Sequence, residues 1–165
     1  MSRNLLTGLV GAWCPSLGPS GYTLLDRSGR GTHGSLVNMD AGSDWVGSSG
    51  GWTLDFDGSN DYVSLPSISV ANEVTISCWF YARSTGQGML FNKQTTNTAF
   101  NLFVFGAALL LRGGGTTAVS TSVSANTLYH AVATIKGTAG TIYLNGVQAA
   151  TGSVDAISNT TGVCE

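Results

Sequence analysis

The chain has 165 residues, a typical length for one domain, and 42% of them are hydrophobic while only 10% are charged. Seven basic and nine acidic residues give a formal net charge of −2, so neither a nucleic-acid-binding basic stripe nor a polybasic membrane tether is expected. A hydrophobic chain with 23 glycines and few charges is typical of all-β proteins, and we expect residues 1–165 to form a single domain.

The first apolar segment, residues 9–13, is predicted to be a strand rather than part of a signal peptide. Its apolar run is short, and Trp13 stands where signal cleavage requires a small residue. The longest apolar stretch, residues 100–111, contains Asn101 and Gly106 and falls short of the roughly 20 residues that a membrane-spanning helix needs. We therefore expect neither a signal peptide nor a transmembrane segment.

Short segments with alternating apolar and polar residues follow along the chain, and they predict a succession of β-strands. In residues 74–81 the even-numbered residues are apolar, so Trp79 and Tyr81 fall on the opposite face of that strand. Asn145-Gly146 favours a two-residue hairpin, because a type I′ turn needs positive φ at both central positions. The other predicted strands are residues 52–57, 62–65, 88–92, 100–105, 108–112, 128–136, 141–144 and 147–150. Strands at this spacing predict a β-sandwich or jelly roll.

Six blocks in the same order resemble the laminin-G-like domains of the concanavalin A-like lectin/glucanase superfamily. They are GLVGAW at 8–13, LDRSGRGTHGSL at 25–36, LDFDGSNDYV at 54–63, VTISCWF at 74–80, LYHAVA at 128–133 and IYLNGV at 142–147. The resemblance implies an all-β chain folded as an antiparallel β-sandwich jelly roll of the concanavalin A-like type.

Residues 153–165 depart from the family pattern, which usually ends in a strand that pairs beside the first one. Three explanations stay open: these residues do the same job in another form, the chain is truncated, or a neighbouring chain covers the edge. An uncovered strand edge invites association, so we expect a homo-oligomer.

Catalytic residues are not expected. Glycosidases of this superfamily use paired glutamates, and a retaining pair needs two carboxylates about 5 Å apart. The two glutamates here, Glu73 and Glu165, are far apart in the sequence. Asp55 and Asp57 share one strand face, but they adjoin a turn that Asp and Asn side chains typically cap. A glycosidase or a lyase is therefore the less favoured function.

A structural calcium ion is the one cofactor that the resemblance implies, near the loop that holds Asp26 and His33. Asp26 is the best candidate ligand, since Ca²⁺ prefers carboxylate and carbonyl oxygens. The alternative is a loop held by hydrogen bonds, with His33 bonded to the backbone. His130 is expected to be a half-buried strand residue, and Cys78 a small buried hydrophobic residue.

Sugar binding requires aromatic platforms flanked by hydrogen-bonding groups. Trp45, in the glycine- and serine-rich segment 42–47, is the best exposed candidate. Trp79 and Tyr81 would line a sheet face opposite the apolar one, and the alternative for all three residues is a place in the core.

The resemblance is to the short form found among bacteriophage virion surface proteins. It implies a non-catalytic recognition or structural module, a phage particle decoration or fibre protein at the virion surface, with a capsid protein or a glycan as partner. The alternative is a carbohydrate-binding lectin domain of a larger secreted or cell-surface protein, with an extracellular location.

Overall fold

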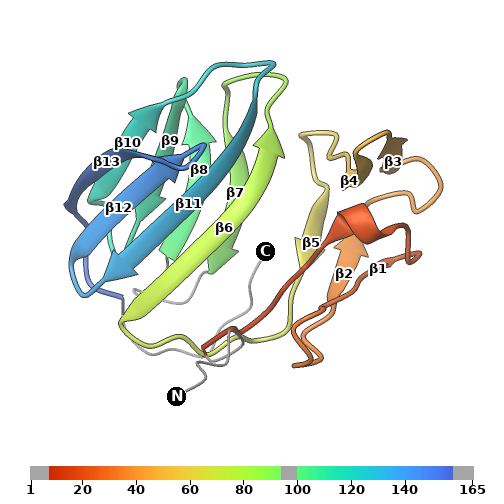
Figure 1. Ribbon diagram of the computed structural model, residues 1–165, viewed down its shortest axis with the longest axis horizontal. Helices are drawn as coiled ribbons and strands as arrows, with labels where there is room; N and C mark the ends of the chain where they lie inside the picture. Colours follow the sequence, from red (N-terminus) through yellow and green to blue (C-terminus); the bar gives the residue numbers. More distant parts are fainter. Residues whose placement is uncertain (1–7, 94–99, 158–165) are drawn as a thin grey trace. The chain divides into compact units, whose positions relative to one another are not determined.

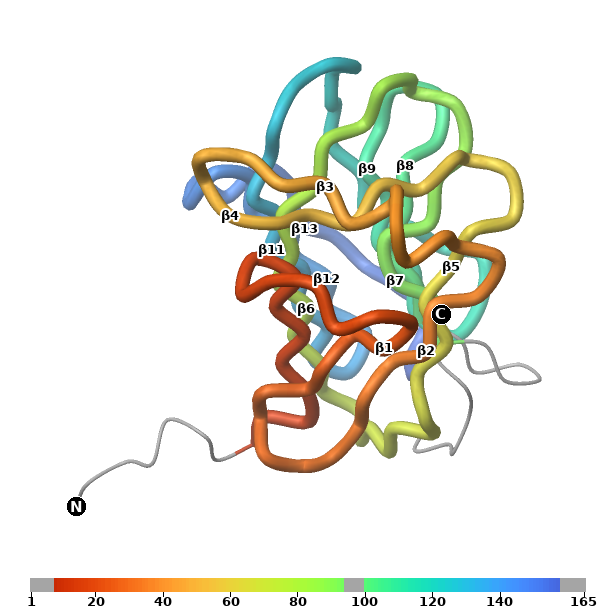
Figure 2. The backbone as a smooth tube through the Cα atoms, turned by 90° about the vertical axis from the view of Figure 1, so that its right-hand side faces the viewer, coloured from red at the N-terminus to blue at the C-terminus, as the bar shows by residue number. Residues whose placement is uncertain are grey.

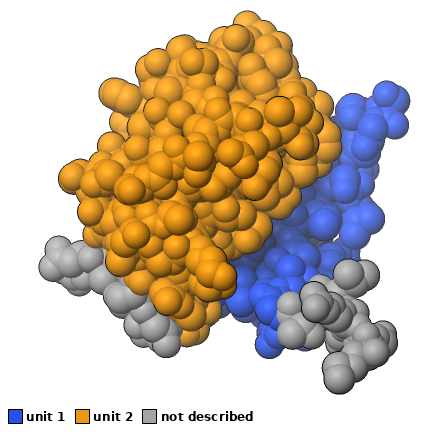
Figure 3. Space-filling model, turned by 60° about the vertical axis from the view of Figure 1, so that its left-hand side comes forward, with its two compact units in different colours: residues 1–68, 165 blue, residues 69–164 orange. Residues whose placement is uncertain are grey.

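The computed structural model describes residues 8–93 and 100–157. The chain divides into two compact units, residues 1–68 with residue 165, and residues 69–164 (Figure 3). Each unit has its own sheets. The organisation as a single domain stays a prediction, and residues 158–165 of the segment that departs from the family pattern lie outside the described residues.

The first unit contains short strands and one turn of 3-10 helix in its described part, and its course can be followed in Figure 2. Three strands form an antiparallel sheet with the order β1-β2-β5, while β3 and β4 form a separate hairpin. The bounds are η1 Pro15–Leu17, β1 Thr23–Leu24, β2 Gly34–Val37, β3 Trp45–Ser48, β4 Gly51–Leu54 and β5 Tyr62–Ser64. The buried core of this unit consists of Leu24, Leu36, Met39 and Trp45.

The prediction of a strand at residues 9–13 is wrong. Within the described part of the chain, this segment makes one isolated β-bridge, between Trp13 and Asp26, and η1 follows directly. The indole Nε1 of Trp13 donates a hydrogen bond to the carbonyl of Thr32 at 2.7 Å. The segment is therefore held by the loop that follows β1 and not by a neighbouring strand.

The second unit consists of two four-stranded antiparallel sheets, with the orders β10-β9-β8-β7 and β13-β12-β11-β6 (Figure 1). The bounds are β6 Glu73–Tyr81, β7 Gly88–Lys93, β8 Phe100–Phe105, β9 Ala108–Arg112, β10 Ala118–Ser122, β11 Leu128–Lys136, β12 Ala139–Leu144 and β13 Val147–Ser153. The predicted strands from residue 74 onward are thus confirmed. No helix among the residues that the structure describes is long and apolar enough to cross a membrane.

The two sheets of this unit pack face to face over an apolar core. Leu102, Leu109 and Leu111 of one sheet and Ala131 and Ile142 of the other are each at most 1% exposed. Burial of such side chains supplies the main favourable free energy of folding. The same alternation turns the odd-numbered residues of β6, Trp79 and Tyr81 included, toward the other side of their sheet.

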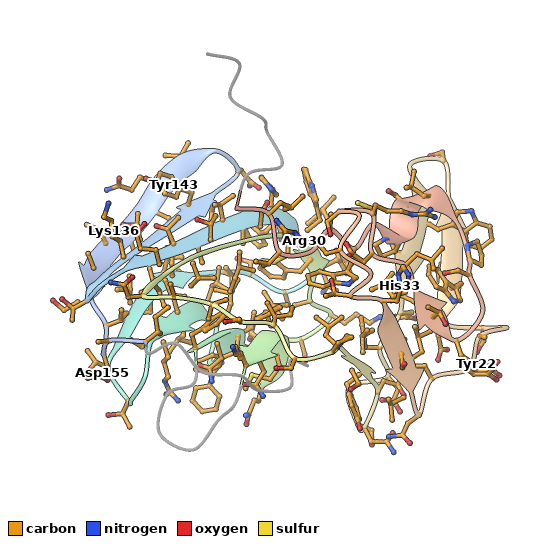
Figure 4. The ribbon with its side chains drawn as sticks, turned by 90° about the horizontal axis from the view of Figure 1, so that it is seen from below. Tyr22, Arg30, His33, Lys136, Tyr143 and Asp155 are labelled. Atoms are coloured by element: carbon orange, nitrogen blue, oxygen red, sulfur yellow. The ribbon has the colours of Figure 1, made fainter. Side chains whose placement is uncertain are left out.

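Tight turns set the register of these strands. Asn145 and Gly146 have φ values of 51° and 82°, so the predicted hairpin with two left-handed residues between β12 and β13 is confirmed. Between β9 and β10 the chain wraps around Asp155, labelled in Figure 4. The Asp155 carbonyl accepts from Gly114 N at 3.1 Å, and its carboxylate accepts from Thr117 N at 2.8 Å.

Candidate functional site

A side-chain cluster centred on Trp79 lies on the solvent side of the sheet β13-β12-β11-β6. The Trp79 side chain is 68% exposed and stacks on His130, with 4.8 Å between ring centroids and 27° between ring planes. The two residues are direct cross-strand partners in the β6–β11 register, which brings their rings together. His130 Nε2 lies 2.9 Å from Ser77 Oγ, so the imidazole is held by a hydrogen bond as well as by the stack.

The hairpin turn between β12 and β13 supports the same cluster through the backbone. His130 N donates to Asn145 Oδ1 at 2.9 Å, and Asn145 N donates to the His130 carbonyl at 2.8 Å. On the other side of Trp79, the hydroxyl of Tyr81 donates to Asn126 Oδ1 at 3.2 Å. Tyr81 and its cross-strand partner Leu128 are 55% and 57% exposed, so they extend the aromatic end of the cluster.

Hydroxyl groups follow the aromatic cluster along the same side of the sheet. Four threonines, one on each strand, lie opposite one another in register and form a row: Thr75, Thr134, Thr141 and Thr151. We call the whole surface the outer face; its residues are Thr75, Ser77, Trp79, Tyr81, Leu128, His130, Val132, Thr134, Thr141, Tyr143 and Thr151. Figure 4 shows Tyr143 on this side of the sheet.

One exposed ion pair marks the end of the outer face farthest from Tyr81. Lys136, which is labelled in Figure 4, forms this pair with Glu73. The distance between Lys136 Nζ and Glu73 Oε1 is 3.4 Å. An ion pair exposed to this degree adds little stability because water screens it. It does neutralise the two formal charges next to the outer face.

The prediction that Trp45 is an exposed platform is wrong. Trp45 begins β3 instead of lying in a loop, and the β3–β4 hairpin directs its ring into the core of the first unit. Its side chain is 5% exposed, and its indole Nε1 donates to the Gly21 carbonyl at 2.9 Å. By contrast, Trp79 and Tyr81 are exposed on one face, as a platform requires.

Asp26 is a buried carboxylate whose two oxygens accept five hydrogen bonds. Oδ1 accepts from the backbone N–H groups of Ala12 and Ser28, and Oδ2 accepts from the Ser28 hydroxyl and from both N and Oγ1 of Thr32. Burial alone would raise the pKa of Asp26, but the hydrogen bonds from Ser28, Ala12 and Thr32 outweigh it and hold this pKa well below its usual range.

This donor set does not fit a calcium ligand, because N–H and O–H groups occupy the lone pairs that a cation would need. Asp26 N also donates to His33 Nδ1 at 2.9 Å, so the predicted hydrogen bond between His33 and the backbone is confirmed. Within residues 8–93 and 100–157, no group of three or more His, Cys, Asp or Glu side chains is arranged to hold a metal ion.

The described acidic residues take structural roles that differ from a glycosidase pair. Glu73 pairs with Lys136, and Asp57 accepts from the N–H groups of Ser59 and Asn60 in a tight turn. The Ser77–His130 hydrogen bond has the distance of a nucleophile and its base, and the two residues lie on neighbouring strands of one sheet. Burial raises the pKa of Cys78 to about 11, which keeps this thiol protonated at neutral pH.

Sequence reasoning missed most of the hydroxyl groups of the outer face. The sequence alone does place Ser77 and Thr75 on the face of Trp79, because they alternate with the apolar residues of β6, and this placement is confirmed. His130 was expected to be a half-buried strand residue, and this is confirmed. Its contact with Trp79 depends on the pairing of β6 with β11, which no local pattern encodes.

Comparison with known proteins identifies the family of this fold. A laminin-G family profile, described as the concanavalin A-like lectin/glucanases superfamily, matches residues 57–163. A similar solved structure is domain 4 of AbnA, a GH43 extracellular arabinanase from Geobacillus stearothermophilus, in complex with arabinotriose. It has a TM-score of 0.66 and 15% identity, and the match covers 88% of this chain and 81% of that chain. No curated protein matches. The predicted all-β, antiparallel, concanavalin A-like fold class is confirmed, and the chain belongs to the concanavalin A-like lectin/glucanase superfamily.

Proposed function

We propose that the chain is a non-catalytic recognition module that binds a glycan on its outer face. The observation that carries this proposal is the exposed Trp79 ring, held in place by its stack on His130. A large aromatic ring left in water offers a flat apolar surface, and sugar rings have apolar C–H faces that stack on such surfaces. Because His130, itself hydrogen-bonded to Ser77, already stacks on the Trp79 ring, a ligand would not have to order that ring on binding.

The polar surroundings support the same proposal. A bound sugar presents many hydroxyl groups, and each one loses hydrogen bonds to water when the sugar binds. The outer face offers hydroxyl groups next to the stacking platform, from Ser77 and from Thr75 and Thr134 of the threonine row. The complex of the similar arabinanase domain with arabinotriose supports a glycan as the ligand class, since the two folds are alike.

A glycan array followed by calorimetry tests the proposal. We expect the protein to bind a subset of glycans, and Trp79→Ala to weaken that binding at least tenfold, roughly the effect of removing a central interface tryptophan. Trp52→Ala is the matched control, because Trp52 is 39% exposed on β4 of the first unit and is not one of the outer-face residues, so the variant should leave affinity unchanged. Equal losses for both variants, or no binding on the array, would overturn the proposal.

The absence of catalysis is part of the proposal. We expect no release of reducing sugar from bound polysaccharides and no hydrolysis of a p-nitrophenyl acetate ester. Ester hydrolysis that disappears in Ser77→Ala would instead assign the Ser77–His130 pair a catalytic role.

We further propose, from the resemblance to short phage proteins, that the module acts as a homo-oligomer at the virion surface, with a capsid protein as a second partner. A monomeric mass in light scattering at micromolar concentration would contradict the oligomer. An adjoining catalytic domain in the parent reading frame would favour the alternative, a lectin domain of a larger secreted or cell-surface protein.

A further inference from the structure

The chemistry of the outer face changes in one direction, along the paired strands β6 and β11. Tyr81 and Trp79 lie at one end of β6, and the hydroxyl groups of Ser77 and Thr75 follow on the same side. Trp79 and Thr75 are four residues apart, so roughly 13 Å separates them at about 3.3 Å per residue. A single sugar ring stacked on Trp79 would not reach Thr75, whereas a chain of several linked rings would.

Two hydroxyl groups of the outer face that are free to bind a ligand lie on β6 and β11. Thr75 and Thr134 are cross-strand partners, and neither side chain has a hydrogen-bond partner among the residues that the structure describes. Thr151 differs, because its Oγ1 donates to the Gly140 carbonyl at 3.2 Å and lies 3.2 Å from Thr141 Oγ1. The free hydroxyl groups of Thr75 and Thr134 therefore continue the line that starts at Trp79, and the hydroxyl group of Tyr143 lies beside that line on β12.

The outer face offers no unpaired cation for an anionic sugar. Glu73 and Lys136, which the register places on the same side at its end, pair with each other at 3.4 Å, and its other residues include no Lys, Arg, Asp or Glu. A sulfated or carboxylated glycan would have to approach without a partner for its negative charge. Charged ligands of proteins are normally met by complementary charge, so this face favours neutral ligands.

We infer that the ligand of the outer face is an uncharged, linear glycan that lies along β6 and β11. One sugar ring stacks on Trp79, and further rings of the same chain form hydrogen bonds with Ser77, Thr75 and Thr134. This inference rests on the proposed function and specifies which glycans the same face takes.

Calorimetry with oligosaccharides of increasing length tests the inference on the full chain. The uncharged probes are arabino-, xylo- and cello-oligosaccharides from mono- to hexasaccharide, and the anionic probes are oligogalacturonates of the same lengths. We expect the affinity for at least one uncharged series to rise at least tenfold from mono- to hexasaccharide. We expect oligogalacturonates to bind at least tenfold more weakly. Tighter binding of oligogalacturonates, or an affinity independent of length, would overturn the inference.

Hydroxyl deletions then test the direction of the chain. Thr75→Val and Thr134→Val should each weaken hexasaccharide binding about threefold to tenfold, the usual effect of losing one hydrogen bond. Both should leave monosaccharide binding unchanged. Thr151→Val is the matched control in the same threonine row and should have no effect on the hexasaccharide. A loss in Thr151→Val as large as that in Thr75→Val would show a chain lying across the strands and would contradict the inference. Melting curves for each variant establish that the fold is retained.

These outcomes distinguish a failure of the linear-chain inference from a failure of the proposed glycan-binding function. If Trp79→Ala removes binding while neither length nor the threonine hydroxyls matter, the glycan-binding function stands and the linear-chain inference fails. If no oligosaccharide of any series binds, both fail.

Discussion

Asp26 is a buried carboxylate whose charge is stabilised entirely by neighbouring N–H and O–H groups. The five hydrogen bonds join residue 12 to the 28–32 turn, and the separate hydrogen bond from Asp26 N to His33 Nδ1 attaches the residue that precedes β2. The sequence correctly singles out Asp26 as a structurally important residue, since it lies in the characteristic family block at residues 25–36. It does not reveal whether hydrogen-bond donors or a cation would surround the carboxylate.

The pH dependence of stability follows from the lowered pKa of Asp26. Because the folded-state pKa lies below the unfolded value near 3.8, ionised Asp26 stabilises the fold at neutral pH. That contribution is lost as the pH falls below about 4 toward the folded-state pKa. Asp26→Asn should lower the free energy of unfolding by about 2–4 kcal/mol at pH 7, because the amide places a donor against existing donors.

Urea unfolding at pH 7 and at pH 3 measures this effect. The difference between wild type and Asp26→Asn should shrink at the lower pH. Asp40→Asn serves as the control, since Asp40 is exposed and accepts from Gly42 N, and it should cost less than about 1 kcal/mol. Similar losses for the two variants would contradict the role assigned to Asp26.

Chelation gives a second check at the same residue. Because hydrogen-bond donors occupy the Asp26 oxygens, we expect the melting temperature to be the same with EDTA as with added calcium. A lower melting temperature in EDTA that is restored by calcium would show a cation site and contradict this account of the loop.

At the scale of single elements, strands with strong apolar alternation were predictable and strands of small residues were not. The strands β6, β8, β9 and β11 carry apolar residues at every second position. By contrast, β10 has one large apolar residue, Val119, and β3 lies in a stretch rich in glycine and serine. Such strands form because a partner strand supplies backbone hydrogen bonds and because their side chains pack against the rest of the protein. Residues 9–13 were wrongly predicted to be a strand for the opposite reason. They are apolar, but no strand in the described part of the chain pairs with them.

The glycine turn between β9 and β10 offers a test at this scale. A Cβ added at Gly113 would lie 1.8 Å from the backbone oxygen of Asp155, so the backbone would have to move apart. We expect Gly113→Ala to destabilise the protein by about 2–4 kcal/mol, as overpacking and a broken hydrogen bond combine. Gly88→Ala is the control, because a Cβ there would have no atom within 4 Å. Thermal unfolding that gives the same midpoint for both variants would contradict this role of Asp155.

At the scale of the molecule, the fold class was predictable from the six sequence blocks together. Each block is short, but the six occur in the same order as in the concanavalin A-like family. The site was predictable only in part. Trp79 and Tyr81 could be assigned to one face of β6 from alternation alone. Their partner His130 lies 51 residues beyond Trp79, and only the register of β6 with β11 joins the two rings. Trp45 was misassigned because its burial depends on the hairpin that β4 completes.

The central claim is that a glycan stacks on Trp79 and its partner His130. The most direct test is an NMR titration of the isotope-labelled protein with the glycan that binds best. We expect the indole signal of Trp79 and the imidazole signals of His130 to shift as the glycan is added, while the indole of the buried Trp45 stays unchanged. Shifts confined to residues outside the outer face, with the Trp79 signal unmoved, would contradict the account.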